Sequence, residues 1–275
     1  MADFTLSAIR QDTTKRIFHI ITENESMTRQ EIAEKADFSL MTVGKITDIL
    51  YEKNILIYEK SEQTKIGRKA EIVRLQNKLF ELVLVFSGKK AEIILCDFLL
   101  NTKKSTSIKC ADMTEDEIAS NVLTESMGLI VEASAVGAVV GVTVVSDENN
   151  ELCEKILSEL KNAFSIKAGL ITDYYSALSL GCAVNKSDKS ILLITGEKMS
   201  VAGRYIKNLE TVHKGIIKNK EQIPVLCDYL VPHEVYSNVK GTENDKNINF
   251  LDSKNEKKLV IMGAAFKARE EYALN

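Results

Sequence analysis

Apolar residues recur at helical spacing near the beginning of the chain. Within residues 6–22, an isoleucine stripe lies along one side of a helix drawn at 3.6 residues per turn, made by Ile9, Ile17, Ile20 and Ile21. Such a stripe is typical of a helix that packs one face against a core. The pattern therefore predicts a first helix over residues 6–22.

Two further helices are predicted directly afterwards. In TRQEIAEKA, Thr28 is followed three residues later by Glu31, the spacing of a capping box at the start of a helix. Asp37 and Phe38 then form a tight stretch, and Ser39 is a suitable N-cap for a third helix in SLMTVGKITDILYEKN. The order helix, turn, helix is the arrangement that places a recognition helix in the major groove of DNA.

The third predicted helix has a buried side and an unusual exposed end. Its expected core positions are Val43, Ile46, Ile49 and Leu50. Leu40 and Met41 are left near the exposed N-terminal end, where they can pack on thymine methyl groups. Thr42 and Lys45 lie at the same end and can contact phosphates or base edges. This end of the helix is the one that enters a major groove.

Three more candidate DNA contacts lie where the second and third helices begin, at Thr28, Arg29 and Ser39. Gly44, inside the third helix, costs roughly 1 kcal/mol relative to alanine. Three explanations for this glycine stay open. It can allow close approach to DNA, it can allow close approach to the second helix, or it can be a tolerated weak spot in the helix.

A basic hairpin follows the helices. ILIYEKSE and AEIVRLQ are rich in β-branched residues and predict two strands joined by the loop QTKIGRK, which is the wing of a winged helix. Lys65, Arg68 and Lys69 gather at its tip beside Gly67, where they can reach a minor groove or a phosphate. The alternative is an ordinary solvated hairpin on a domain that contacts proteins.

The rest of the chain predicts a mixed sheet covered by helices. LVLVFSG and AEIILCDF predict a hairpin, with a third strand at 105–110 and a helix from Thr114 to about Ala133. Strand VGAVVGVTVV, helix ENNELCEKILSELKNAF, strand AGLIT, helix YYSALSLGCAV, strand SILLIT and a strand at 201–206 follow. The polar segment 214–258 predicts a loop, and KLVIMGAAFKAREEYA predicts a strand that enters a helix. The domains are therefore expected at 1–78 and 79–275.

Composition limits the class of protein but does not indicate a function. The 275 residues suit two domains, and 45% hydrophobic with 27% charged residues describes an ordered globular protein. The net charge is −3, and residues 1–78 hold 13 Lys or Arg against 12 Asp or Glu, so only the placement of the basic residues points to DNA. The five cysteines are scattered singly, which favours reduced thiols. Without a signal-peptide or membrane-spanning pattern, we expect a cytoplasmic protein with no membrane partner.

Residues 28–76 resemble the DNA-binding domain of the ROK family, which comprises repressors, open reading frames and sugar kinases. Family repressors carry a pattern like SRxxIAxxxxLSxxTVxxIxxxLxxxGLI and a wing with GRR or GRK. This chain has TRQEIAEKADFSLMTVGKITDILYEKNILI and then GRKA. Asn54 replaces the usual glycine, and asparagine is the next best residue for a left-handed helix end. The resemblance implies an α/β protein in which a winged helix-turn-helix precedes a reduced actin-like (ribonuclease H-like) sugar kinase domain, with its second lobe largely absent.

The motifs of the family's kinases are missing or altered. FSGKK stands where the phosphate-binding DxGxT turn is expected, and only Gly196 and Gly203 remain of the second phosphate loop. Asp173 in ITDYYSA matches the family's catalytic base, although we favour an ordinary N-cap and regard it as a vestigial candidate. The sugar-binding EIGH segment and the zinc cluster have no counterpart, since His213 and Cys227 are isolated. The resemblance thus implies a pseudokinase-like domain with no enzymatic activity, cofactor or metal.

These features favour a DNA-binding transcriptional regulator of the repressor type. One recognition helix reads too few base pairs for a unique site, so we expect a homodimer on an inverted repeat of double-stranded DNA. The second domain would supply the twofold contact. Family resemblance suggests a sugar effector, which the lost sugar motif leaves without support. Two alternatives stay open: a divergent sugar kinase that uses Asp173 as base, and a winged-helix protein-interaction module.

Overall fold

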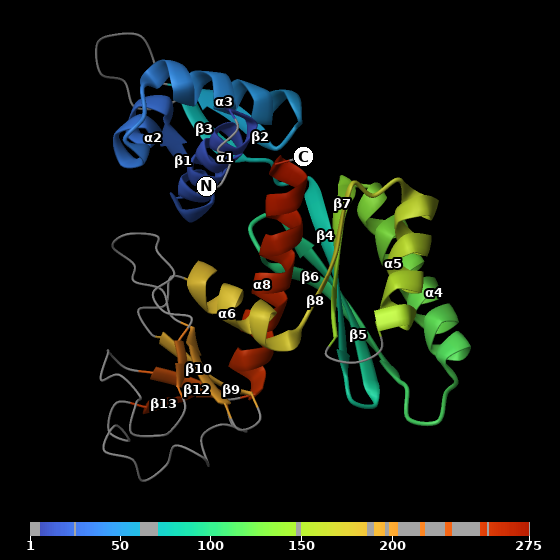
Figure 1. The fold of residues 1–275 in the computed structure, drawn as a ribbon. Helices are drawn as coiled ribbons and strands as arrows, with labels where there is room; N and C mark the ends of the chain where they lie inside the picture. The colour runs from blue at the N-terminus through green and yellow to red at the C-terminus, as the bar shows by residue number, and fades with distance from the viewer. Residues whose placement is uncertain are drawn as a thin grey trace.

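The computed structural model has an N-terminal unit of helices above a larger unit that contains two sheets (Figure 1). It describes residues 6–24, 26–60, 71–146, 150–185, 190–195, 198–202, 215–217, 229–232, 248–251 and 253–274. Among the described helices, none is both long enough and apolar enough to cross a lipid bilayer.

The N-terminal unit contains the three predicted helices and a small antiparallel sheet. The elements are α1 (Leu6–Asn24), β1 (Ser26–Thr28), α2 (Arg29–Ala36), α3 (Leu40–Glu52), β2 (Leu56–Lys60) and β3 (Glu71–Leu75). The sheet has the order β1-β3-β2, and β1 is a strand that the sequence pattern did not predict. Its core is made by buried apolar side chains from every helix, among them Ile17, Ile21, Ile32, Val43, Leu50 and Val73.

Left-handed residues end two of these elements where the sequence indicated. Asp37 has φ 56° and closes α2, with its neighbour Phe38 donating a hydrogen bond to the carbonyl of Ala33 at 3.2 Å. Asn54 has φ 58° directly after α3, which confirms the left-handed conformation expected of this asparagine. The chain can therefore reverse direction sharply before α3 and again before β2.

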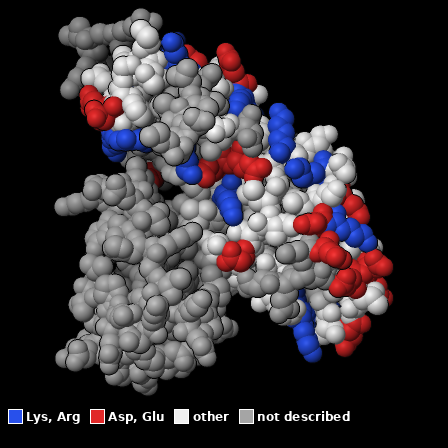
Figure 2. Space-filling model, in the orientation of Figure 1, with Lys and Arg blue, Asp and Glu red and all other residues white. Residues whose placement is uncertain are grey.

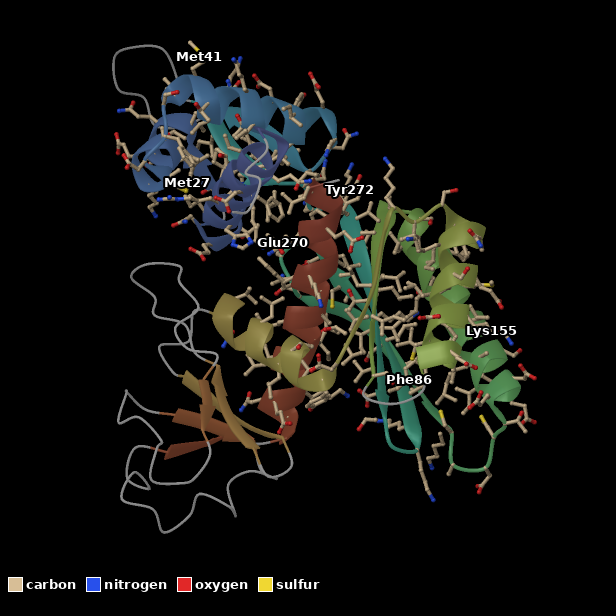
Figure 3. The ribbon with its side chains drawn as sticks, viewed as in Figure 1. Met27, Met41, Phe86, Lys155, Glu270 and Tyr272 are labelled. Carbon is tan, nitrogen blue, oxygen red and sulfur yellow. The ribbon has the colours of Figure 1, made fainter. Side chains whose placement is uncertain are left out.

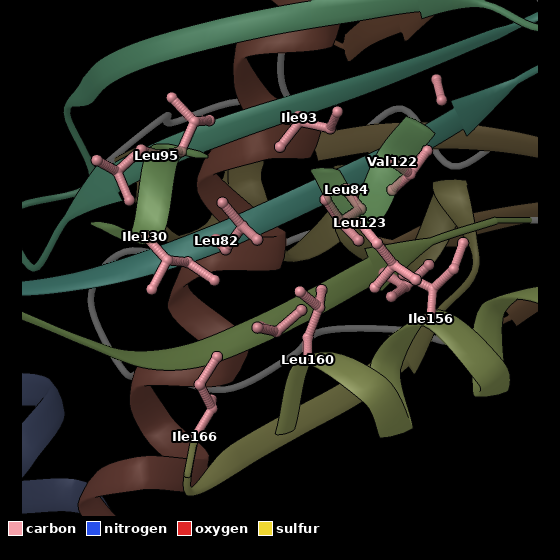
Figure 4. Close-up of a cluster of buried hydrophobic side chains, with 14 of the residues drawn as sticks. Leu82, Leu84, Ile93, Leu95, Val122, Leu123, Ile130, Ile156, Leu160 and Ile166 are labelled. Atoms are coloured by element: carbon pink, nitrogen blue, oxygen red, sulfur yellow. The ribbon is translucent and has the colours of Figure 1, made fainter. Parts of the chain in front are cut away.

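The inner strands β4 and β7 of the first large sheet are buried on both faces. It comprises β4 (Leu79–Ser87), β5 (Lys90–Asp97), β6 (Thr102–Lys109), β7 (Ala138–Val145) and β8 (Ala168–Thr172) in the order β6-β5-β4-β7-β8. Helices α4 (Glu115–Ser134) and α5 (Asn150–Phe164) cover one face, where Leu82, Leu84, Ile93 and Ile156 are among the buried residues (Figure 4). Burial on both faces explains why β4 and β7 are almost continuous apolar runs.

Helices α6 (Tyr174–Val184) and α8 (Ser253–Leu274) lie over the other face (Figure 1). Their backbones touch, because a Cβ added at Gly181 would lie 1.7 Å from the carbonyl oxygen of Leu259. A Cβ added at Gly263 would lie 1.9 Å from the carbonyl oxygen of Ala177. The terminal GAA segment therefore serves helix packing. The predicted strand at KLVIM is wrong, since these residues are helical. A short apolar run cannot be distinguished from a buried helix by periodicity alone.

The expectation that residues 214–258 form a loop and that the second lobe is largely absent is also wrong. A second five-stranded sheet contains β9 (Ser190–Thr195), β10 (Lys198–Ala202), β11 (Gly215–Ile217), β12 (Tyr229–Pro232) and β13 (Ile248–Leu251). Its order, β11-β10-β9-β12-β13, repeats that of the first sheet, with antiparallel β10 and parallel β12. The strand expected at 201–206 overlaps β10 only at residues 201 and 202, and residues 203–206 lie outside the described part of the chain. Strands of three or four residues offer too few alternations to be predicted from a polar segment.

The last turns of α8 pack on the N-terminal unit. One hydrophobic cluster contains Phe18 from α1 together with Phe98, Val140 and Ala273 from the larger unit. Figure 3 shows Glu270 and Tyr272 at this contact. The two units therefore share a continuous apolar core at the point where they meet.

Candidate nucleic-acid interface

The N-terminal end of α3 is capped and carries exposed apolar side chains. The hydroxyl of Ser39 accepts a hydrogen bond from the backbone N–H of Thr42 at 3.1 Å, and the two hydroxyl oxygens are 2.9 Å apart. Leu40 is 57% exposed and Met41 is 72% exposed. Figure 3 places Met41 on the outer side of the N-terminal unit, away from the larger unit.

The opposite side of α3 packs on the core as predicted, except that one buried position differs from the prediction. Val43, Ile46 and Leu50 are buried as expected, but Ile49 is only half-buried and Thr47 is fully buried instead. Thr47 can be buried because its hydroxyl donates a hydrogen bond to the carbonyl of Gly44 at 3.0 Å.

Gly44 and Lys45 lie on the open side of the same helix. A Cβ added at Gly44 would meet no heavy atom within 4 Å, so contact with α2 does not require this glycine. That excludes one of the three explanations offered for it. Lys45 is exposed, and it has no ion pair with any residue that the structure describes.

Thr28 is occupied by its own helix cap. Its backbone N–H donates to the carboxylate of Glu31 at 2.7 Å, its hydroxyl does so at 2.9 Å, and that hydroxyl accepts from the Glu31 backbone at 3.2 Å. The backbone hydrogen bond from Thr28 is the main cause that holds the pKa of Glu31 below its usual value. The predicted capping box is therefore confirmed, while DNA contact by Thr28 stays a prediction.

Arg29 differs most from the expected exposed DNA contact. Its guanidinium is bonded to Asp48 of α3 and, at 2.6 Å, to the hydroxyl of Tyr58 of β2. The side chain is only 29% exposed. The sequence pattern did not indicate these partners, because they are 19 and 29 residues away along the chain.

The predicted wing lies partly outside the described residues. Strands β2 and β3 pair antiparallel, with Leu56 opposite Leu75 and Lys60 opposite Glu71, as a hairpin requires. The four predicted tip residues Lys65, Gly67, Arg68 and Lys69 fall in the segment 61–70 and remain a sequence-based prediction.

The residue that matches the kinase base acts as a helix cap. Asp173 accepts a hydrogen bond from the backbone N–H of Ser176 at 2.8 Å, at the start of α6. Burial would raise its pKa, but the bonds from Ser176 and the charge of Lys267 hold the pKa below its ordinary value. A carboxylate that remains ionised in this way stabilises the helix start.

The remaining positions that resemble kinase motifs lie either in a turn or outside the described residues. Gly88 has φ 55° and forms the tight turn between β4 and β5, where the resemblance places the altered phosphate-binding motif FSGKK. Lys90, two residues after Gly88, pairs with Glu92 at 2.5 Å. Gly196, Gly203, His213 and Cys227 lie outside the described residues. Within the described part, no group of three or more His, Cys, Asp or Glu side chains could hold a metal ion.

An ionic contact between the units was not indicated by any sequence motif. The imidazole of His19 in α1 lies 2.5 Å from the carboxylate of Glu270 in α8, and the ammonium of Lys15 lies 3.3 Å from it. His19 also packs edge-on against Phe266, with ring centroids 5.0 Å apart. These contacts join α1 to α8 beside the shared apolar core.

Two buried ionisable side chains lie close to this contact. Arg269 is 2% exposed, donates to the backbone carbonyl of Phe98, and lies between the rings of Phe18 and Phe266. Burial lowers its pKa to about 10. Glu81 is fully buried in β4, and its carboxylate has no hydrogen-bond partner among the described residues, so burial raises its pKa well above the ordinary value.

Comparison with solved structures gives a match over nearly the whole chain. A crystal structure of a ROK family transcriptional regulator, a homologue of the E. coli MLC protein, aligns over 97% of this chain and 98% of that chain, with 10% identity and a TM-score of 0.62. This match confirms the resemblance for the fold.

Two further structures are weaker matches. An uncharacterized protein from Pseudomonas aeruginosa with similarity to peptidase YEAZ has a TM-score of 0.39 and 14% identity over 68% of this chain and 92% of that one. A Ppx/GppA family member from Aquifex aeolicus also has a TM-score of 0.39, with 8% identity over 71% and 90%. No protein-family model matches the sequence, and the search of curated proteins finds no match.

Proposed function

Because the chain shares its fold from end to end with a ROK family transcriptional regulator, we propose that it is a sequence-specific DNA-binding regulator of this type. Residues 1–78 are its winged helix-turn-helix domain, and α3 is the recognition helix. The observation that carries the proposal is the exposure of Leu40 and Met41, at 57% and 72%, at the capped end of α3.

Exposed side chains of this kind need a reason when they lie side by side at a helix start. Leu40 and Met41 are close to Lys45 and to Gly44, above which there is open space. A recognition helix uses this combination, with apolar contacts to thymine methyl groups, a cation for phosphate or guanine, and a small residue that lets the helix approach. Each of these features lies on the side of α3 that points away from the protein core.

The second domain is proposed to be non-catalytic and to serve dimerisation. Asp173, the residue that matches a kinase base, is committed to the cap of α6 by its bond to Ser176. A homodimer would present two recognition helices to the halves of an inverted repeat. We further propose repression as the outcome and the cytoplasm as the site of action, with a sugar effector as a dispensable part of the hypothesis.

The test is selection of DNA fragments by the purified full chain from a randomised duplex library at several salt concentrations. Salt is varied because contacts to phosphate dominate nonspecific affinity. Enrichment of an inverted repeat would support a dimeric, sequence-specific regulator. Retention of no sequence even at low salt would overturn the proposal and favour a protein-interaction module.

A further inference from the structure

Arg29 is the centre of a cluster of polar side chains from four elements. It begins α2, and its Nη2 atom donates to Asp48 of α3 and to the hydroxyl of Tyr58 of β2, which is 2.6 Å away. The carboxylate of Glu71, the first residue of β3, lies 4.0 Å from the same nitrogen. We refer to Arg29, Asp48, Tyr58 and Glu71 as the Arg29 cluster.

Further contacts within the cluster hold the side chain of Tyr58 in one position. The guanidinium carbon of Arg29 lies 4.8 Å from the centre of the Tyr58 ring, and the Tyr58 hydroxyl donates to Asp48 at 3.1 Å. On its other side, the Tyr58 ring stacks on Tyr51 of α3, with centroids 4.7 Å apart. Tyr58 therefore links strand β2 to the recognition helix twice, once through its ring and once through its hydroxyl.

The positive charge of Arg29 is already neutralised within the protein. One guanidinium faces two carboxylates, those of Asp48 and Glu71, which are 55% and 54% exposed. Arg29 itself is 29% exposed, and Nη2 is engaged by both Asp48 and Tyr58. A cation in this state has little charge to offer a phosphate, whereas Lys45 is exposed and unpaired within the described residues.

We propose that Arg29 is a positioning residue for DNA recognition, which fixes the angle between the recognition helix α3 and the strands β2 and β3 without contacting DNA. The inference rests on the proposed function, because it names how that interface is held in shape. Losing the cluster would leave both carboxylates without their cation and would free β2 and β3 to shift relative to α3.

The test measures affinity for the selected duplex as a function of salt in the variants Arg29→Gln, Arg29→Lys and Tyr58→Phe. A direct phosphate contact contributes about 0.9 to the slope of log K against log salt. A lysine keeps the charge but cannot lay a planar guanidinium over the Tyr58 ring, as Arg29 does at 4.8 Å from the ring centre. Arg74→Gln is the matched control, because it breaks the exposed pair of Arg74 with Glu59 in the same strands.

If Arg29 acts by position, Arg29→Gln and Arg29→Lys both weaken binding roughly tenfold, as loss of one good base contact would, while the salt slope stays that of the parent. Tyr58→Phe weakens binding by a smaller factor. In the Arg29→Gln background, Tyr58→Phe causes no further loss of affinity. The control variant Arg74→Gln binds DNA like the parent. Faster amide exchange in β2 and β3 of Arg29→Gln, measured without DNA, would accompany these effects.

A slope reduced by about 0.9 in Arg29→Gln, with affinity restored by Arg29→Lys, would overturn the inference and make Arg29 a phosphate contact. Parent-like binding by Tyr58→Phe together with unchanged amide exchange in Arg29→Gln would also overturn it. Both outcomes differ from failure of the proposed function, in which the parent itself selects no DNA.

Discussion

Arg29 and Arg269 each join several elements, but in surroundings of opposite kind. Arg29 lies at the surface of the N-terminal unit among partly exposed carboxylates. Arg269 lies beneath the contact between the two units, at 2% exposure, between two aromatic rings and near the buried Glu81. Water screens the first cluster and is excluded from the second, so the same side chain affects different properties of the protein.

Screening limits what the Arg29 cluster can add to stability, since exposed ion pairs contribute about 0–1 kcal/mol. Its effect should appear in DNA affinity, which depends on the relative placement of α3 and the strands. Removing a buried hydrogen-bond donor instead leaves its acceptor unsatisfied and costs about 1–3 kcal/mol. The predictions below test this division between recognition and stability.

The largest expected effect is on stability, at Arg269. Arg269→Met leaves the buried carbonyl of Phe98 without its hydrogen-bond donor, so the free energy of unfolding should fall by about 1–3 kcal/mol in urea denaturation. An unfolding free energy equal to that of the parent would show that this hydrogen bond contributes nothing to stability.

Gly44→Ala should have a smaller effect, of opposite sign. Since a Cβ at this position meets no atom within 4 Å, the alanine should raise the free energy of unfolding by about 0.5–1 kcal/mol. If DNA approaches this side of α3, the same variant should bind the selected duplex more weakly. Thermal unfolding and a DNA titration separate the two effects, and unchanged affinity would mean that DNA does not come close to residue 44.

The smallest expected effect is a change in acid stability at the contact between the units. Burial would raise the pKa of Glu270, but His19 and Lys15 hold it below the ordinary value of 4.5. The stabilisation from this carboxylate is therefore fully present above pH 4.5 and is lost as the pH falls through the lowered folded-state pKa.

Glu270→Gln removes that contribution. The parent should exceed the variant in unfolding free energy by a few tenths to 1 kcal/mol above pH 4.5, and the difference should shrink in more acidic buffer. The check is a series of urea titrations from pH 7 to pH 3. A difference that grows as the pH falls would contradict this assignment of Glu270.

Sequence reasoning located the N-terminal helices well because their signals are local. The capping box at Thr28, the N-cap at Ser39 and the left-handed Asn54 each depend on residues within a few positions. Leu40 and Met41 could be singled out for the same reason, since one turn of helix decides which side chains lack a core partner. The predicted contacts of the wing tip stay predictions.

Features that depend on distant residues could not be predicted in this way. His19 and Glu270 are 251 positions apart, and Arg269 is 171 positions from the carbonyl that it binds. The short strands β11, β12 and β13 exist through pairing with distant neighbours, and their own apolar pattern is too brief to indicate a strand. The partners of Arg29 on α3 and β2, 19 and 29 positions away, likewise cannot be read from the motif.

The salt dependence of binding to the selected duplex, compared for the parent, Lys45→Ala and Lys155→Ala, tests most directly whether α3 recognises DNA. Lys155 is a matched control, because it is exposed on α5 and pairs with Asp116 at 2.8 Å where acidic side chains gather over α4 and α5 (Figure 2). The expected result is weaker binding and a slope lower by about 0.9 for Lys45→Ala, with Lys155→Ala like the parent. Equal affinities and slopes for all three proteins would contradict the proposed interface.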